Sequence, residues 1–246
     1  MKNPFTERLE RLRWPGDRAK ALRLEEELKA RLSITPLKAS PRLVAGVDAA
    51  FAGEMIVGAA CLFTYPGLVK VAESHCVSKV PMPYVPGLLS FREAGALIEA
   101  LEGLPERPDL LICDGQGIAH PRGLGIASFL GAVLSIPSVG TAKSRLAGEY
   151  EEPGPEKGSR SPLVLDGRVV GAVVRTRDRT RPLFVSPGHG IDVEGAVEMT
   201  MGCTTRFRIT EPVRCADRLS KEVARGVKQG RKTAPASSGG RGGTRR

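Results

Sequence analysis

Two aspartates each follow an apolar run of the kind found in buried strands. Asp48 comes after LVAGV and Asp114 after LLIC, so each carboxylate lies near the carboxyl end of its strand. If the strands are parallel neighbours, a spacing of about 4.8 Å makes the two anions repel strongly unless a cation lies between them. Such open, oxygen-rich sites select Mg²⁺, with Mn²⁺ as substitute, and the bound ion promotes hydrolysis of a phosphodiester.

Each of these residues also fits a plainer role. An aspartate at a strand end is often a helix cap or a turn former. Glu93 stands three residues after Ser90, which is the spacing of a capping box at a helix start. GTAKS around Lys143 is not a phosphate-binding P-loop, because Ala142 replaces the glycine that should precede the lysine.

Three strand-like runs open the region that would carry these residues. They lie at 43–51, 55–64 and 68–80, and the segments between them are short enough for hairpin turns. We therefore predict three antiparallel strands in succession.

Helical and strand-like segments then alternate. Helical spacing occurs at 90–104, 124–134, 193–202 and 214–225, and strand-like runs occur at 109–114, 138–140 and 181–186, with a hairpin over 163–176 that turns at Asp166-Gly167. We predict an α/β domain whose mixed sheet of five to six strands, three antiparallel and then parallel, is flanked by helices.

The two ends of the chain differ from this domain. A leucine pattern predicts an N-terminal helical cover at 1–40, followed by the domain at 41–226, and a Gly-, Ser- and Arg-rich composition predicts a disordered basic tail at 227–246. The net charge of +10 favours a polyanionic partner, but six basic residues after Gly226 leave only about +4 for the body.

The five cysteines form an odd set without a Cys-x-x-Cys pair, which indicates reduced thiols and neither disulfides nor a zinc site. The first residues lack the apolar core of a signal peptide, and no stretch approaches the ~18 apolar residues of a membrane span. We expect a soluble, cytoplasmic protein without a membrane partner.

Several long motifs occur in a fixed order. They are VDAAF from Val47, MPYVPGLLSFRE from Met82, DGQGIAHPRGLGIAS from Asp114, VGTAKSRL from Val139, SPGHGIDVEGAVE from Ser186 and TEPVRCADRLS from Thr210. Together they resemble the endonuclease V family, the deoxyinosine-specific endonucleases, from about Leu43 to Val223. The resemblance implies a ribonuclease H-like fold.

The resemblance also implies roles for the charged residues. Asp48, Glu93 and Asp114 would hold the metal, and Glu93 would complete the acidic catalytic site. Lys143 would lie near the substrate phosphate and offset its developing negative charge. Asp217, where we expect His or Asp, leaves a further carboxylate for a metal.

Residues that would contact substrate follow from the same motifs. Pro83-Tyr84-Val85-Pro86 matches the family's wedge, whose prolines stiffen a loop that can enter the base stack. Phe129 stands where many bacterial relatives have His, so a contact there is absent or replaced by stacking. The extruded base would enter a pocket lined by main chain, although isolated glycines are also common in turns. The other predicted substrate-binding residues are Gly87, Leu88, Gly115, Gly117, His120, Arg122 and Gly125.

The family activity is a nick at the second phosphodiester 3′ to a deaminated adenine, which leaves a 3′-hydroxyl and a 5′-phosphate and starts repair. We expect a monomer that binds DNA containing deoxyinosine, with inosine-containing RNA as the alternative. A non-catalytic damage-binding module and a general ribonuclease H-like resolvase are competing classes. The acidic set disfavours the first, and the wedge disfavours the second.

Overall fold

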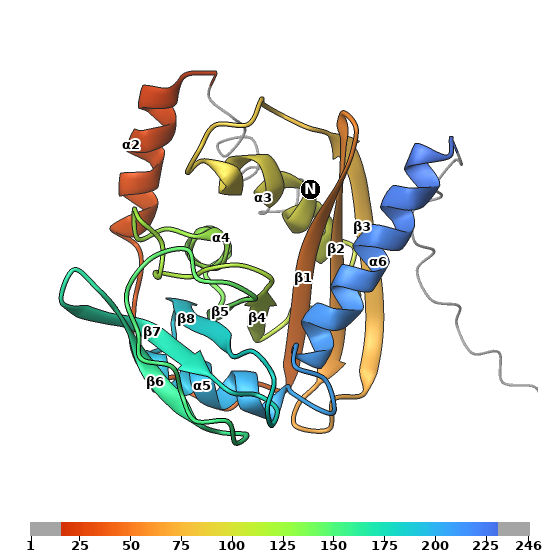
Figure 1. Ribbon diagram of the computed structural model, residues 1–246. Coiled ribbons are helices and arrows are strands. Elements are labelled where there is room, and N and C mark those ends of the chain that lie inside the picture. Colours follow the sequence, from red (N-terminus) through yellow and green to blue (C-terminus); the bar gives the residue numbers. More distant parts are fainter. Residues whose placement is uncertain (1–15, 231–246) are drawn as a thin grey trace, which may run out of the picture.

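The computed structural model describes residues 16–230 of the 246-residue chain. A mixed sheet of eight strands forms its centre, in the order β3-β2-β1-β4-β5-β8-β7-β6, and helices cover both faces (Figure 1). The predicted α/β class is confirmed, with a wider sheet than the five to six strands expected.

The first three strands form the predicted antiparallel meander. They are β1 (Leu43–Ala52), β2 (Met55–Thr64) and β3 (Lys70–Lys79). Gly53 adopts a φ of 62° in the first hairpin turn, a conformation that glycine adopts without strain. β2 is buried along nearly its whole length, since helices pack on both of its faces.

Two parallel strands extend the sheet from β1. β4 (Leu110–Cys113) pairs with β1, and β5 (Ser138–Ala142) pairs with β4, so their carboxyl ends lie at one edge of the sheet. β8 (Leu183–His189), β7 (Arg168–Val174) and β6 (Arg160–Leu165) then continue it in antiparallel fashion. The β6–β7 hairpin turns at Asp166-Gly167 as predicted, with positive φ at both residues.

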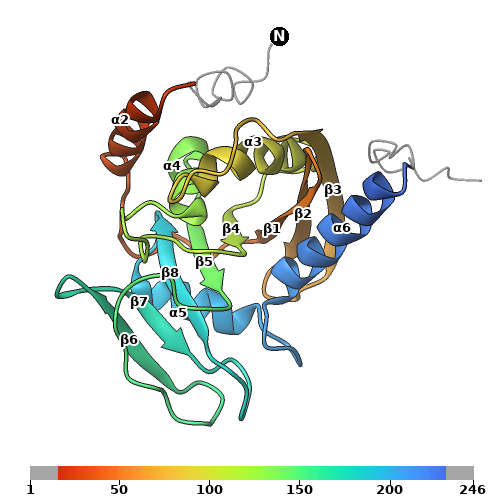
Figure 2. The same cartoon turned by 45° about the horizontal axis from the view of Figure 1, so that its top comes forward.

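Helices form a layer on each face of the sheet (Figure 2). α3 (Leu89–Glu102) and α4 (Ile126–Leu134) share one apolar core with α2 (Arg18–Lys29) and the sheet. α5 (Val193–Gly202) and α6 (Glu211–Lys228) pack into a second core on the opposite face. The sheet is thus buried between two helical layers.

α6 lies very close to β1. A Cβ atom at Gly46 would overlap the main chain of Pro212 and Val213, so only glycine permits this approach. The contact brings the first two turns of α6 over β1, in which Asp48 lies mid-strand, directly after the pairing with β4 ends at Val47, and not near the carboxyl end as predicted. α6 begins at Glu211, three residues before its predicted start.

The described part of the predicted N-terminal cover contains α2, which Asp17 caps by accepting a hydrogen bond from the Ala19 amide at 2.9 Å. The rest of that prediction, at residues 1–15, and the predicted tail from residue 231 lie outside the described residues. Within residues 16–230, no helix combines the length and the apolar character needed to cross a membrane.

Candidate active site

The two aspartates predicted from strand context lie side by side. Val47 and Cys113 are paired in the parallel ladder of β1 and β4, so Asp48 and Asp114 follow at matching positions. α6 brings in Asp217, and one carboxylate oxygen from each of the three residues lies within 4.8 Å of the other two. The three carboxylates can hold a metal ion, and their oxygen-only, partly exposed donor set suits a hard divalent cation.

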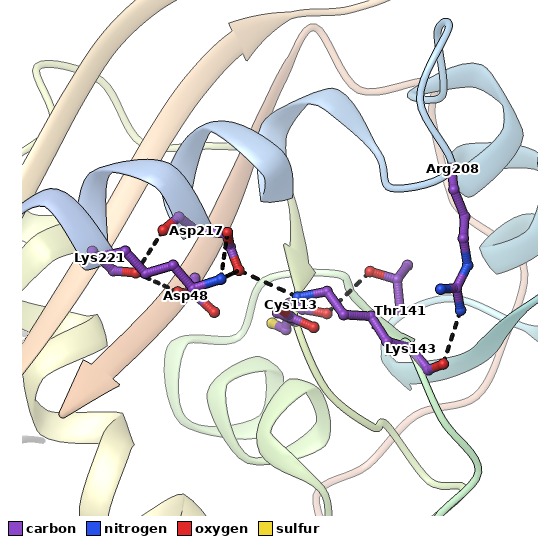
Figure 3. Close-up of polar contacts among 9 residues, drawn as sticks. Asp48, Cys113, Thr141, Lys143, Arg208, Asp217 and Lys221 are labelled. Carbon is purple, nitrogen blue, oxygen red and sulfur yellow. Dashed lines mark hydrogen bonds and ion pairs between the residues drawn. The ribbon is translucent and has the colours of Figure 1, made fainter.

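Hydrogen bonds from α6 and from the end of β5 fix these carboxylates. Ser220 Oγ donates to Asp48 Oδ2 at 2.5 Å. Lys143 Nζ donates to Asp114 Oδ2 at 2.5 Å and to Asp217 Oδ1 at 3.2 Å. Lys221 Nζ contacts both Asp217 oxygens, at 2.7 and 2.8 Å (Figure 3). Two lysines therefore balance part of the negative charge.

The pKa values of the carboxylates reflect burial, mutual repulsion and the neighbouring lysines. Burial raises the pKa of Asp48 to about 6; the Ser220 hydrogen bond opposes this shift, while Asp114 and Asp217 add to it. Burial tends to raise the pKa of Asp217 too, but the hydrogen bonds and charges of Lys221 and Lys143 outweigh it, so the net shift is downward. A divalent cation would remove the repulsion that burdens Asp48.

Glu93 lies beside this group but outside the set of three. Burial raises its pKa to about 8, and the negative charges of Asp48 and Asp114 add to the shift. The capping-box interpretation of Ser90 and Glu93 is wrong: α3 has Leu88 at its N-cap without a side-chain hydrogen bond, and Ser90 is buried in the first turn. Glu93 therefore has no capping role, and it lies near enough to Asp48 and Asp114 for their charges to raise its pKa.

Lys143 is positioned through its own main chain. It follows β5 directly, and Arg208 Nη2 donates to its carbonyl oxygen and to that of Pro182, both at 2.8 Å. Thr141 Oγ1 donates to the Cys113 carbonyl at 3.2 Å, which ties β5 to β4 beside the site (Figure 3). The pKa of Lys143 is raised overall. Burial alone would lower it, but the hydrogen bonds and charges of Asp114 and Asp217 have the larger combined effect.

The sequence analysis gave no role to the supporting residues Arg208, Ser220 and Lys221, although Ser220 ends the motif TEPVRCADRLS. The spacing of Asp217 and Ser220, three apart on one helix, is a signal that could have placed both on the same face. Arg208 stands in a loop and contacts residues 26 and 65 positions away, so no local pattern marks it.

The predicted wedge stands out from the surface between β3 and α3. Tyr84 is 64% exposed, and the Arg92 guanidinium lies 5.8 Å from its ring centre and 4.6 Å from that of Phe51. Val85 is half-buried and packs against the α3-side core. Leu88 is completely buried, so it anchors the loop and its side chain has no access to a ligand.

Arg122, predicted to contact substrate, forms contacts within the protein. Its Nε and Nη2 donate to the buried Glu25 carboxylate of α2 at 2.7 and 2.8 Å, and Nη2 also bonds the Gly87 carbonyl. The Arg122 amide donates to His120 Nδ1 at 3.2 Å. These residues clamp α2, the wedge loop and the loop after β4 together.

The predicted glycines allow main chains to pack closely. A Cβ at Gly117 would overlap the Pro187 carbonyl, and one at Gly125 would overlap the Gln116 carbonyl. A Cβ at Gly115 would crowd the Ile126 side chain. Gln116, which sequence analysis missed, donates from Nε2 to the Ser144 carbonyl at 3.2 Å. Its buried Oε1 has no hydrogen-bond partner in the described part of the chain.

Phe129 belongs to the core. Its side chain is fully buried and meets Phe91 edge to face, with ring centres 5.2 Å apart. Of the two alternatives expected at this position, an absent substrate contact or one replaced by stacking, the burial of the ring favours the absent contact.

The fold and the cluster of carboxylates define a nuclease of the type that cuts within a phosphodiester chain. The family model for endonuclease V matches residues 26–218. The chain belongs to the endonuclease V family.

Known proteins of this family are similar along most of the chain. Endonuclease V of Geotalea uraniireducens is 52% identical over 203 residues, which cover 82% of this chain and 87% of the relative. The crystal structure of endonuclease V from Streptomyces avermitilis has a TM-score of 0.83 at 38% identity, covering 87% of this chain and 96% of that one.

A third similar structure contains nucleic acid. It is a single-residue variant of Ciona intestinalis endonuclease V in complex with a 23mer DNA containing an inosine followed by a ribo-adenosine. Its TM-score is 0.75 at 25% identity, and the match covers 85% of this chain and 97% of that chain.

Proposed function

We propose that this protein is a Mg²⁺-dependent endonuclease that recognises deoxyinosine in DNA. It hydrolyses the second phosphodiester 3′ to the lesion, leaves a 3′-hydroxyl and a 5′-phosphate, and thereby starts repair in the cytoplasm. The observation that carries the proposal is the meeting of Asp48, Asp114 and Asp217, whose oxygens lie within 4.8 Å of one another beside Lys143. The inosine-containing DNA bound by the Ciona intestinalis relative supports the choice of lesion.

The three aspartates would hold Mg²⁺, for which Mn²⁺ can substitute. When bound, the ion supplies a positive charge for the scissile phosphate and lowers the pKa of coordinated water. Glu93 completes the acidic set. Burial and the charges of Asp48 and Asp114 raise its pKa, so a neighbouring cation would favour its ionised form.

During cleavage, the Lys143 ammonium contacts the substrate phosphate. Its ammonium bridges Asp114 and Asp217, at 2.5 and 3.2 Å. A phosphate oxygen can take the place of either contact, so that the ammonium offsets the charge that develops during cleavage. The Arg208 hydrogen bond to the Lys143 main chain keeps the residue beside the carboxylates.

The wedge recognises the gap left by the extruded base. Tyr84 presents a ring that is 64% exposed and is oriented by Arg92, and the two flanking prolines limit how much loop entropy is lost on binding. A base–aromatic stack of this kind needs no particular partner base, which suits an enzyme that must find one lesion in any sequence.

A pocket of about 420 Å³ is lined in part by Lys143 and would provide a path for the strand. Tyr150, Arg179 and Arg181 are among its lining residues, and both of these arginines are exposed, whereas Phe184 behind Tyr150 belongs to the core. Cationic and aromatic side chains along a groove are what single-stranded nucleic acid binds. This arrangement supports passage of the cut strand next to Lys143.

The test uses labelled duplexes with one deoxyinosine, matched strands with one inosine in RNA, and unmodified controls, each incubated with the protein and Mg²⁺. We expect a single nick in the deoxyinosine strand, mapped on a sequencing gel to the second phosphodiester and bearing a ligatable 5′-phosphate. Equal cutting of unmodified strands would exclude lesion recognition. Preferential cutting of the RNA would make inosine-containing RNA the substrate.

Asp217→Asn and Glu222→Gln form a matched pair for the metal site, because both carboxylates lie on α6 and Glu222 is exposed away from the carboxylate cluster. The first substitution should raise the Mg²⁺ concentration needed for nicking, and the second should leave it unchanged. An identical Mg²⁺ dependence in both variants would remove Asp217 from the metal site.

A further inference from the structure

Two cysteines and a glutamate meet on the side of α6 away from the carboxylates. Cys61 in β2 and Glu73 in β3 are directly opposite each other in the antiparallel ladder, and Cys215 reaches them from α6. The two sulfurs and one carboxylate oxygen all lie within 4.8 Å of one another. These three residues form the thiol cluster. Their sequence spacing could not reveal it, because each comes from a different element.

The thiol cluster and the acidic site lie on opposite flanks of the same helix. Cys215 and Asp217 are two positions apart, which turns their side chains by about 200° around the helix axis. Cys61 is paired with Gly46, the residue at which the helix main chain touches β1. The two groups of ligands are therefore separate, and they differ in chemistry: sulfur with one oxygen here, and oxygen alone at the acidic site.

The cluster has a closed side and an open side. Cys61 is fully buried and Cys215 is 4% exposed, whereas the Glu73 side chain is 40% exposed. A small cation can enter past Glu73 and meet both sulfurs, with water available to complete its coordination. Some zinc sites in proteins combine sulfur ligands with one coordination position that is open to water.

We propose that the thiol cluster is a Zn²⁺ site. Thiolate sulfur and carboxylate oxygen are both ligands that zinc uses, and the soft sulfurs discriminate against Mg²⁺. Binding releases both thiol protons to solvent and leaves one net negative charge at the cluster. Lys70 Nζ lies 3.0 Å from Glu73 Oε2, and Arg218 Nη2 lies 4.0 Å from Cys215 Sγ, so cations stand close enough to balance this charge.

Only small movements are needed to bind the ion. Cys215 Sγ and Glu73 Oε2 are 3.9 Å apart, and a sulfur and an oxygen on a tetrahedral zinc ion are separated by roughly 3.6 Å. The Lys70–Glu73 ion pair is exposed, and such pairs contribute little to stability, so Glu73 can exchange its ammonium partner for a metal. The bound ion would join β2, β3 and α6 and so hold α6 on the sheet.

Cobalt is the probe, because Co²⁺ bound to thiolates absorbs strongly in the near ultraviolet by charge transfer from sulfur, and Co²⁺ bound to oxygen ligands alone does not. The full-length protein is stripped of metal, kept reduced with a phosphine and titrated with Co²⁺. We expect the thiolate band to saturate at one equivalent and to disappear when Zn²⁺ is added. Absence of the band in the wild-type protein would overturn the proposal.

Variants locate the ligands. Cys61→Ser should remove most of the thiolate band, with Cys215→Ala as the second variant if the first does not fold. Cys203→Ser is the matched control, since Cys203 is another buried thiol of the same core but lies outside the cluster. Glu73→Gln should weaken Co²⁺ binding about tenfold or more while keeping the band. A band unchanged in both cysteine variants would refute the assignment.

The inference does not depend on the nuclease activity. Asp48→Asn, which alters the acidic site, should leave the thiolate band intact. The two proposals can therefore fail separately. A protein that shows the thiolate band but does not nick contradicts only the proposed function, and a protein that nicks but lacks the band contradicts only the zinc site.

Discussion

Lys143 and Lys221 contact the same carboxylate from different directions, and their local geometry separates their roles. Lys143 lies between Asp114 and Asp217, where a phosphate would approach, whereas Lys221 pairs with Asp217 from the next turn of α6. We therefore expect Lys143 to transfer its contacts to the substrate and Lys221 to keep Asp217 charged and oriented.

Lys143→Ala should lower the single-turnover rate of nicking about 10²- to 10³-fold, the usual effect of removing one preorganised group that stabilises transition-state charge. Binding of a deoxyinosine duplex in Ca²⁺ should change much less. The control is Lys38→Ala. Lys38 is exposed and lines a different pocket, together with Asp109 at the amino end of β4. A rate equal to that of the wild-type protein would exclude Lys143 from the chemistry.

Asp114→Asn should abolish nicking. It removes the negative charge that would bind the metal ion and that pairs with the Lys143 ammonium, while keeping the shape of the side chain. Lesion binding, measured by fluorescence anisotropy, should persist. Asp178→Asn is a surface control whose carboxylate accepts from the Lys157 amide, away from the carboxylates. Nicking by the Asp114 variant would contradict the metal assignment.

His120 predicts a specific dependence of stability on pH. Burial lowers its pKa to about 4, with Arg122 adding to the shift, and its Nδ1 accepts a hydrogen bond that requires the neutral ring. Between pH 6.5 and 4 the unfolded chain binds a proton that the folded chain does not, so the free energy of unfolding falls as the pH falls.

Urea denaturation at pH 7 and pH 4 can measure this contribution. The wild-type protein should lose about 1–2 kcal/mol more than His120→Gln, which has no proton to bind, because solvent screens the partly exposed ring. Equal losses in the two proteins would mean that the ring is charged in the folded state.

At the scale of elements, the loop from 81 to 88 joins β3 to α3 and is held at its base by Leu88 and Arg122. Leu88 is fully buried, and the Arg122 guanidinium bonds the Gly87 carbonyl and Glu25 of α2. The exposed Tyr84 therefore projects from a loop that is fixed at one end, as a wedge requires.

Tyr84→Ala should weaken binding of a deoxyinosine duplex by roughly 1–3 kcal/mol, the range for loss of one base–aromatic stack. Tyr84→Phe should retain most of the affinity, since the ring carries the interaction. An unchanged affinity of the alanine variant would dismiss the wedge.

Glu25 and Glu26 in α2 allow a matched test of the clamp. Glu25→Ala leaves the partly buried Arg122 without its carboxylate and should destabilise the protein by about 1–3 kcal/mol, as well as raising the KM for lesion DNA. Glu26 has a side chain that is 68% exposed, so Glu26→Ala should change stability by less than about 0.5 kcal/mol. Equal effects in chemical denaturation would show that the clamp contributes nothing.

The elements could be predicted from the sequence where the pattern was local. The meander, the turn at Asp166-Gly167 and α5 follow from periodicity and turn residues, and the apolar run before Asp114 indicated a buried parallel strand. Local spacing was misleading at Ser90. Its spacing from Glu93 fits a capping box, but Ser90 is buried inside the first turn of α3 and does not cap the helix.

Contacts between distant segments could not be predicted in this way. Arg122 pairs with Glu25 across 97 positions and Ser220 bonds Asp48 across 172 positions, so neither partner is marked by spacing. The motifs selected Arg122 for substrate contact, but they carry no information on which internal acid it neutralises.

On the scale of the whole molecule, charge is unevenly distributed along the chain. Residues 231–246 contain five basic residues and no acidic ones. Deleting them should flatten the salt dependence of non-specific duplex binding, lowering the slope of log K against log salt by up to about 4, and should spare the choice of lesion. Binding isotherms at several salt concentrations would measure this, and an unaltered slope would show that these residues make no contact with phosphate.

α6 rests directly on β1 at Gly46, although the helix is the last element of the described chain and the strand is among the first. This packing has a consequence for biosynthesis. While the ribosome still encloses residues 211–228, the emerged part of the chain holds Asp48 and Asp114 but neither Asp217 nor Ser220. The three-carboxylate cluster is thus completed only when the last helix has left the ribosome and docked on β1.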